Sequence, residues 1–181
     1  MSCDLTLGRL ESCKDNVGGI KAIYFFNYGG ITPVFDADED AVTELGTATA
    51  FKYELKSDEN TYSENIVSDR NAGTTHFEQN LAISLKGLSQ EDQKEIRLLS
   101  VGRPHIVVHA RNGEAFVAGI EEGMDVTGGT STSIGGAYGD MVGYMPTFQG
   151  RERKPANWIV GATPLDPFAG MTTPPTITEG V

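Results

Sequence analysis

The sequence is poor in cysteine and has no long apolar run. Its only cysteines are Cys3 and Cys13, too few for a disulfide framework. We expect free thiols in a reducing compartment, although one bridge or a metal shared with a partner would also fit this spacing. No run approaches the roughly 18 apolar residues of a membrane span, and the N-terminus lacks a signal-peptide pattern. A soluble protein made in a cytoplasm is expected.

Basic residues are also few. The 181 residues contain 14 Lys and Arg against 25 Asp and Glu, which gives a formal charge of −11. A chain this acidic is not expected to bind nucleic acid through its general surface, because it repels phosphates. It could still border nucleic acid without holding it.

Motifs for catalysis or metal binding are missing too: there is no G-x-S-x-G, H-E-x-x-H or Walker loop. His105 and His109 lie about 13 Å apart on one face of a predicted strand, so they should face solvent or an interface rather than share a metal. The acidic segment 36–44 lacks the glycine and distal glutamate of an EF-hand and predicts a solvated loop or helix start. We assign no catalytic, cofactor-binding or metal residue and expect no enzyme.

Strand patterns dominate what is present. Asn112-Gly113 stands between the apolar runs 106–108 and 116–120, which predicts a β-hairpin closed by a type I′ turn. The run 19–28 is apolar on both faces of a strand, so it should be buried on both, either inside the fold or against another subunit. Candidates for such an inter-subunit contact are Tyr24, Phe26 and Tyr28.

Two further segments, 47–56 and 75–86, alternate between apolar and polar residues, which predicts two long, half-buried strands. Each would have a core face and a wet, charged face. The polar stretch 57–74 between them has no clear element of its own. We expect a long hairpin whose connection is a functional or interacting loop.

One helix is predicted over residues 88–100, with Ser89 as N-cap and Gly102 and Pro104 as the stop. Its narrow apolar stripe predicts that it lies against the outside of a sheet. The glycine-rich stretch 127–139 is interpreted as a flexible surface loop and 140–148 as a strand. Core or subunit interface is the expected place of the aromatic residues Tyr144 and Trp158.

The expected fold is therefore mainly β, an antiparallel β-sandwich or barrel with one flanking α-helix. Residues 1–17 would form an N-terminal arm and 18–160 the β domain. The stretch 161–181, rich in Pro, Thr and Gly, is expected to be an extended C-terminal tail that cannot build a core.

Several short motifs share one resemblance. They are Ile120-Glu-Glu-Gly-Met-Asp-Val-Thr-Gly-Gly-Thr130, Gly139-Asp140, Gly143-Tyr144, Phe148 to Gly150, Glu152 to Asn157, Asn71 to Thr75 with Phe77-Glu78-Gln79, and Arg103-Pro104-His105. In this order they resemble tail tube proteins of tailed phages, in particular of phages that infect Bacteroidetes-type hosts. The resemblance covers roughly residues 18–160, and its motifs are structural.

The resemblance implies a subunit of hexameric rings that stack into the hollow tube through which phage DNA passes without specific binding. Its partners would be copies of itself and other tail proteins. It would be located in the virion tail, which is assembled in the host cytoplasm, and it would need neither a membrane nor a cofactor. By analogy the strands 47–56 and 75–86 would line the bore, and 57–74 would reach the adjacent ring. Lumen candidates are Glu54, Glu78, Lys52, Lys56, Asn80 and Lys86; inter-ring candidates are Asp58, Glu59, Asp69, Arg70 and Asn71.

Two other classes stay open at this stage. The chain could be another virion part, such as a terminator, baseplate or decoration protein, with the same fold and charge. It could also be a receptor- or carbohydrate-binding β-sandwich that uses Trp158, Tyr144 and the glycine-rich stretch as its binding face.

Overall fold

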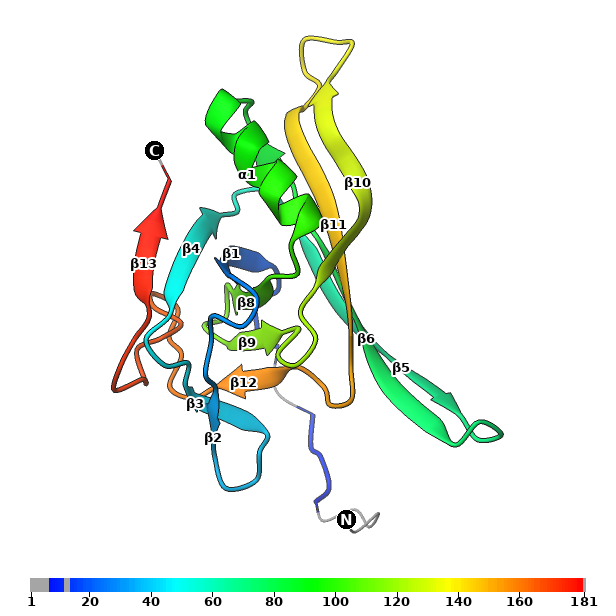
Figure 1. The fold of residues 1–181 in the computed structure, drawn as a ribbon, viewed down its shortest axis with the longest axis vertical. Coiled ribbons are helices and arrows are strands. Elements are labelled where there is room, and N and C mark those ends of the chain that lie inside the picture. The colour runs from blue at the N-terminus through cyan, green and yellow to red at the C-terminus, as the bar shows by residue number, and fades with distance from the viewer. Residues whose placement is uncertain (1–6, 12–13, 181) are drawn as a thin grey trace.

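A computed structural model describes residues 7–11 and 14–180, which form two β-sheets and one helix (Figure 1). The prediction of a mainly β fold with a flanking helix is confirmed. Sheet A has eight strands in the order β13-β4-β1-β8-β9-β12-β3-β2. They are β1 (Ile20–Phe26), β2 (Val34–Phe35), β3 (Ala41–Glu44), β4 (Thr49–Glu54), β8 (His105–Ala110), β9 (Ala115–Ala118), β12 (Asn157–Ile159) and β13 (Thr176–Glu179).

Sheet B has the order β10-β11-β6-β5, and the short β7 also pairs with β11. Its strands are β5 (Thr61–Asp69), β6 (Thr74–Ala82), β7 (Leu85–Lys86), β10 (Asp125–Ile134) and β11 (Val142–Glu152). All its pairs are antiparallel, whereas sheet A contains two parallel pairs, β12 with β3 and β13 with β4. The hairpins β5–β6 and β10–β11 project from the body in opposite directions (Figure 1).

Two apolar clusters hold these layers together. The first, between the sheets, includes Ile23 and Phe25 of β1 and Leu81 and Phe148 of sheet B. The second lies on the other face of sheet A, which curls around it. Strand β1 serves both clusters because its alternate residues point to opposite faces, and the prediction of a strand buried on both sides is confirmed.

The C-terminal segment closes the second cluster. Phe168 is 1% exposed and lies edge-on to Tyr24, with ring centroids 5.1 Å apart. Met171 is also buried there, and β13 then pairs with β4. The expectation of a tail without core residues is therefore wrong, because two apolar side chains are enough to plug a curled sheet.

The hairpin of β8 and β9 is confirmed, but its turn differs from the prediction. Gly113 has φ 96°, whereas Asn112 is not among the residues with positive φ. The amide of Ala110 donates to the carbonyl of Glu114, and the amide of Gly113 to that of Ala110. This is a three-residue loop with glycine in the left-handed position, which needs only one positive φ.

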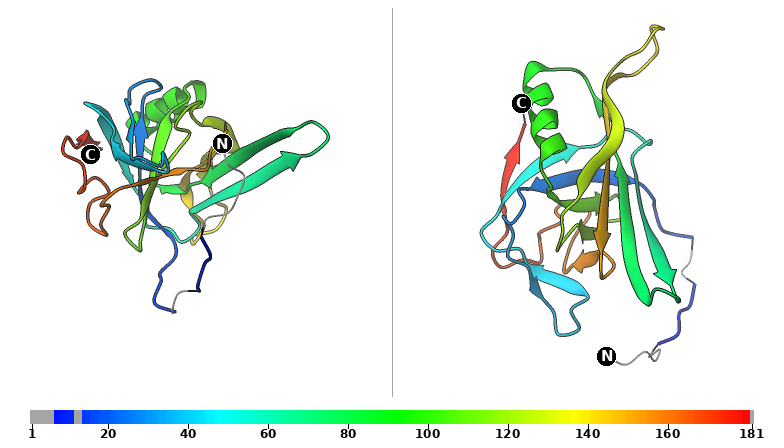
Figure 2. Two further views of the ribbon diagram at one scale, coloured as in Figure 1. Left: turned by 90° about the horizontal axis from the view of Figure 1, so that it is seen from below. Right: turned by 45° about the vertical axis from the view of Figure 1, so that its right-hand side comes forward.

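Helix α1 (Gln90–Val101) has the predicted caps: the amide of Asp92 donates to Ser89 Oγ at 2.9 Å, and Gly102 is the C-cap. It lies against the outside of the molecule beside β10, as predicted (Figures 1 and 2). No helix in the described part of the chain has the length and apolar content of a membrane span.

Two loop predictions are wrong. The glycine-rich stretch 127–139 forms most of β10, whose pairing with β11 tolerates glycine because bulges interrupt the register. The stretch 57–74 contains β5, which pairs with β6 over nine residues. The two alternating strands β4 and β6 thus do not form a hairpin with each other; they lie in different sheets.

The predicted arm, 1–17, is described only in part. Residues 7–11 and 14–17 are exposed and belong to no helix or strand, with Leu7 at 89% and Leu10 at 94% exposure. The predictions for Cys3 and Cys13 fall outside the described residues. Of the acidic segment 36–44, residues 36–40 form the expected solvated turn, in which Asp36 Oδ1 accepts from the amides of Asp40 and Ala41. The prediction is wrong for the remainder, because Ala41–Glu44 form β3.

Candidate functional site

The outer face of sheet B is a broad polar surface. Along β6 the odd-numbered residues, such as Leu81, face the core, and the even-numbered ones face outward. The register extends this face across the neighbouring strands, where it continues with polar and mostly small side chains. It includes Ser63, Asn65, Val67, Asp69, His76, Glu78, Asn80, Ala82, Lys86, Asp125, Thr130, Met145, Thr147, Gln149 and Arg151.

Three of the six lumen candidates share this face. Glu78 and Asn80 are neighbours on β6, and Lys86 lies opposite Gly143 on the same side of β11. Arg151 Nε donates to Glu78 Oε1 at 3.0 Å. The charges on the face are therefore partly paired, and the surface is polar rather than uniformly acidic.

The other three candidates lie elsewhere, so the prediction that all six line one surface is wrong. Lys52 stands opposite Tyr24 in the register of β4 and β1, on the face of sheet A that points away from sheet B. Glu54 follows on the same face and pairs with Lys56 at 3.1 Å. Lys52 instead pairs with Glu179 of β13.

The inter-ring candidates fall into two groups at opposite ends of β5. Asp58 and Glu59 precede the strand, where Asp58 pairs with Arg111 at 3.1 Å. The turn at the far end holds Asp69, whose Oδ1 accepts from the amide of Asn71 at 2.8 Å, and Arg70. A strand of this length separates the two groups by about 30 Å, so only the second group stands at the projecting tip.

The inter-subunit candidates on β1 are mostly internal. Tyr24 and Phe26 are 3% and 1% exposed in the second cluster, so they are unavailable to a partner of the folded chain. Tyr28, just beyond the strand, is 54% exposed and stacks on His105. For Tyr24 and Phe26 the interpretation as core residues is the right one.

Sequence reasoning missed the apolar side chains on the projecting hairpins. Ile66 and Val67 are 70% and 39% exposed on β5, and Ile134 and Tyr138 are exposed at the end of β10–β11. Strands β5 and β10 are also the free edges of sheet B. A signal was present, since Thr, Tyr, Ile and Val are enriched in strands and stand together in 61–67.

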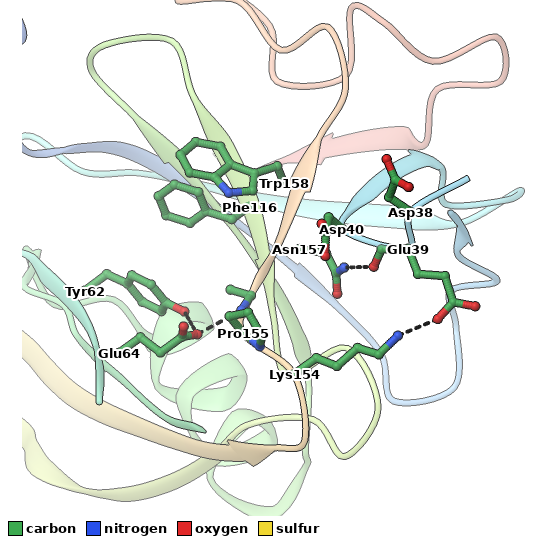
Figure 3. A pocket seen from close by; sticks show the side chains of 11 residues that line it. Asp38, Glu39, Asp40, Tyr62, Glu64, Phe116, Lys154, Pro155, Asn157 and Trp158 are labelled. Carbon is green, nitrogen blue, oxygen red and sulfur yellow. Dashed lines mark hydrogen bonds and ion pairs between the residues drawn. The ribbon is translucent and has the colours of Figure 1, made fainter. Parts of the chain in front are cut away.

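A cleft of about 740 Å³ lies between the root of β5, β12 and the turn before β3 (Figure 3). Its wall is aromatic: Trp158, 48% exposed, meets Phe116 edge-on at 5.2 Å, and Tyr62 lies 5.6 Å from Phe116. Its rim is acidic. The rim residues are Asp38, Glu39, Asp40 and Glu64, with Lys154 paired to Glu39.

Glu64 and Gln79 tie this cleft to both sheets. Glu64 Oε2 accepts from the amide of Ala156 at 2.8 Å and from Gln79 Nε2 at 3.1 Å. Gln79 Oε1 in turn accepts from the amide of Gly119 at 2.7 Å. Burial, with a smaller effect of Glu64, raises the pKa of Tyr62, so this tyrosine stays protonated.

A buried carboxylate, Glu152, anchors the loop after β9. Its Oε1 accepts from the amides of Glu121 and Glu122 at 3.2 and 2.9 Å, while Oε2 has no partner among the described residues. Burial raises the pKa of Glu152. Through these two hydrogen bonds Glu152 holds the backbone at Glu121 and Glu122.

The expectation that both strand histidines face solvent or an interface is wrong, because His105 and His109 are 3% and 1% exposed. His105 is satisfied at both ring nitrogens, by the carbonyl of Gly119 at 2.6 Å and the amide of Gly29 at 3.1 Å. His109 Nε2 donates to the carbonyl of Thr163, and burial lowers the pKa of His109. Within residues 7–11 and 14–180 no three metal-ligating side chains are arranged to hold an ion.

The binding face considered for a carbohydrate or receptor is not assembled. Tyr144 is 3% exposed, and its hydroxyl donates to the carbonyl of Ser89. The glycine-rich stretch belongs to β10, in the other sheet from Trp158. The polar face, the free edges and the projecting hairpins of sheet B are the larger coherent feature. No protein-family model, curated protein or solved structure matches the chain.

Proposed function

We propose that the chain is a structural subunit that assembles into rings, which stack into a hollow tube of the phage tail type. In this proposal sheet B forms the inner wall, and its polar outer face borders the DNA that passes through. The observation that carries the proposal is the combination of a one-sided, five-stranded sheet with two long outermost strands, β5 and β10, whose outer edges pair with no further strand of the described chain.

Uncovered edges favour assembly because each presents unpaired backbone N–H and C=O groups. Edge β5 of one copy would pair with edge β10 of the next, a head-to-tail contact that closes into a ring when the rotation permits. Closure would extend sheet B into a continuous barrel without edges. The apolar side chains Ile66 and Val67 would then contact a neighbouring copy instead of water.

The polarity of the outer face suits a passage for DNA. Cations would hold phosphates, whereas Glu78 neutralises Arg151 on this face and the whole chain carries a charge of −11. Most of the other side chains are hydroxyls and amides, which hydrogen-bond water; Lys86 is a cation on this face without an ion-pair partner among the described residues. DNA would move along such a wall with little friction.

Negative-stain electron microscopy of the purified protein tests the proposal. We expect tubes with a regular axial repeat, formed by the protein alone or with a small initiator. Single rings that never stack would instead indicate a terminator or another virion part of the same fold. A monomer that stays monodisperse at high concentration would overturn the proposal.

Two proline variants test the role of the β5 edge. In an antiparallel edge strand, successive N–H groups point alternately to the partner strand and to solvent. Asn65→Pro and Ile66→Pro each remove one of two successive N–H groups of β5. One of these groups bonds to β6, so its loss disrupts the hairpin; the other points to the free edge, so its loss affects only that edge. The variant that keeps the wild-type melting temperature should form no tubes; normal tubes from it would exclude closure through β5.

A further inference from the structure

The outward stripe of helix α1 combines two cations with exposed apolar side chains, and the exposed Glu91 and Glu95 lie at its edge. Its inward residues, Ile96 and Leu99, are partly buried, whereas the opposite stripe is exposed. That stripe carries Leu98 and Val101, 51% and 80% exposed, together with Lys94 and Arg97. Neither cation has an ion-pair partner among the described residues.

The aromatic cleft has the complementary character. Its wall offers the exposed face of Trp158, and its rim carries Asp38 and Asp40, which have no basic partner in the described part of the chain. Lys154, the one cation that lines the cleft, is occupied by Glu39. The cleft therefore suits an occupant with positive charge beside apolar side chains.

The two surfaces lie at opposite ends of the molecule. Helix α1 stands near one end of the long axis, and β12 with the β2–β3 hairpin stands toward the other (Figure 1). A single copy cannot bring its own helix to its own cleft. Two copies can, and because the surfaces differ, each contact leaves one helix and one cleft free for the next copy.

We propose that the outward face of α1 docks in the Trp158 cleft of a second copy and forms the contact between successive rings. Lys94 and Arg97 of one copy would face Asp38 and Asp40 of the next, while Leu98 and Val101 would cover Trp158. This inference rests on the proposed self-assembly and adds to it the axial contact. It assigns that contact to a helix and a cleft, not to the projecting tips of sheet B.

Charge reversal on either side tests the contact. The helix variant K94E/R97E and the cleft variant D38K/D40K change exposed side chains without described ion pairs, so both should fold, which thermal melting checks. Each variant alone then meets like charge at the contact, which is expected to raise the concentration needed for assembly by about tenfold or more. Reversal of Lys14, a cation outside both surfaces, is the matched control and should leave assembly unchanged.

Mixing the two variants gives the decisive measurement. In the helix variant the contact positions on the helix and the cleft rim are both acidic; in the cleft variant the helix keeps Lys94 and Arg97, and the rim carries two lysines. An equimolar mixture can alternate the two copies, so every contact regains opposite charges. Sedimentation velocity and electron microscopy should show assembly in the mixture at concentrations where each variant alone stays small.

The outcomes separate this inference from the proposed function. If the wild type forms tubes and each variant alone forms them equally well, the helix–cleft contact is overturned and the tube proposal stands. Charge-dependent linear oligomers without tubes would support the contact and overturn the tube. A wild-type protein without any association would overturn both.

Discussion

The two sheets of this molecule differ in how much of their surface is buried. Sheet A is covered on both faces at β1 and β8, where Ile23 and Val107 are fully buried in different clusters. Sheet B is covered on one face only, and the other is polar and open. We therefore expect substitutions in sheet A to destabilise the fold, whereas exposed residues of sheet B can be substituted without loss of the fold.

Loss of the plug behind sheet A should have the largest effect on stability. Phe168→Ala removes a buried ring from the second cluster and is expected to cost about 3–5 kcal/mol of unfolding free energy. Chemical denaturation measures this loss. The control Leu165→Ala, 88% exposed in the same segment, should change stability by less than about 0.5 kcal/mol. Equal effects would mean that the segment does not pack as described.

A change at the junction of the two sheets should have an intermediate effect. Gln79→Leu leaves the buried amide of Gly119 without an acceptor, which costs about 1–3 kcal/mol. Gln79→Glu keeps an acceptor for this amide but loses the donor to Glu64 and places two carboxylates together. Both variants should unfold at lower denaturant concentration than wild type, and an unchanged midpoint for the leucine variant would show that the bridge is dispensable.

The buried histidine of sheet A should make stability depend on pH. Because burial lowers the pKa of His109 in the folded state, the unfolded chain binds the proton more readily. Stability is thus fully present above the unfolded pKa of about 6.5 and falls as the pH drops below it, by up to about 1.4 kcal/mol per pH unit. Thermal melts of the wild type and His109→Gln are measured from about pH 8 to about pH 5. The melting temperature of the wild type should fall more steeply with decreasing pH than that of the variant. If the melting temperatures of both proteins depend on pH in the same way, His109 is not the origin of the pH dependence.

A change on the open face of sheet B should have the smallest effect on folding. Asn65→Lys on β5 alters an exposed side chain and should shift the unfolding free energy by less than about 0.5 kcal/mol. The same change adds a cation to the proposed inner wall and should slow the passage of DNA in an ejection assay. A large loss of stability would show that sheet B is not the tolerant sheet.

Patterns of buried residues predicted the fold class, the helix and about half of the strands from the sequence, whereas β2, β3, β12 and β13 were not predicted. The two-sided strand β1, the β8–β9 hairpin, β11 and the capped helix follow from local composition and spacing. Strands β5 and β10 escaped prediction because both extend beyond the body of the protein. A strand that covers no core needs no apolar alternation, and glycine and serine are tolerated where bulges relieve the register.

The surfaces were harder to predict than the strands. Alternation identified the wet faces of β4 and β6 but could not say that these strands lie in different sheets, because pairing depends on partners far away in the sequence. Hence Glu78, Asn80 and Lys86 share the outer face of sheet B, while Lys52 and Glu54 lie together on a face of sheet A. The cleft around Trp158 joins β5, β9 and β12, and no local pattern connects these segments.

The plug formed by Phe168 also affects how the protein is made. Strand β4 leaves the ribosome long before β13, since Lys52 and its ion-pair partner Glu179 are 127 positions apart. Until the late segment emerges, the concave apolar face of sheet A stays open to water. A nascent chain paused in this interval would expose that face to chaperones and proteases, so the interval of synthesis between the two segments is when the protein is most vulnerable.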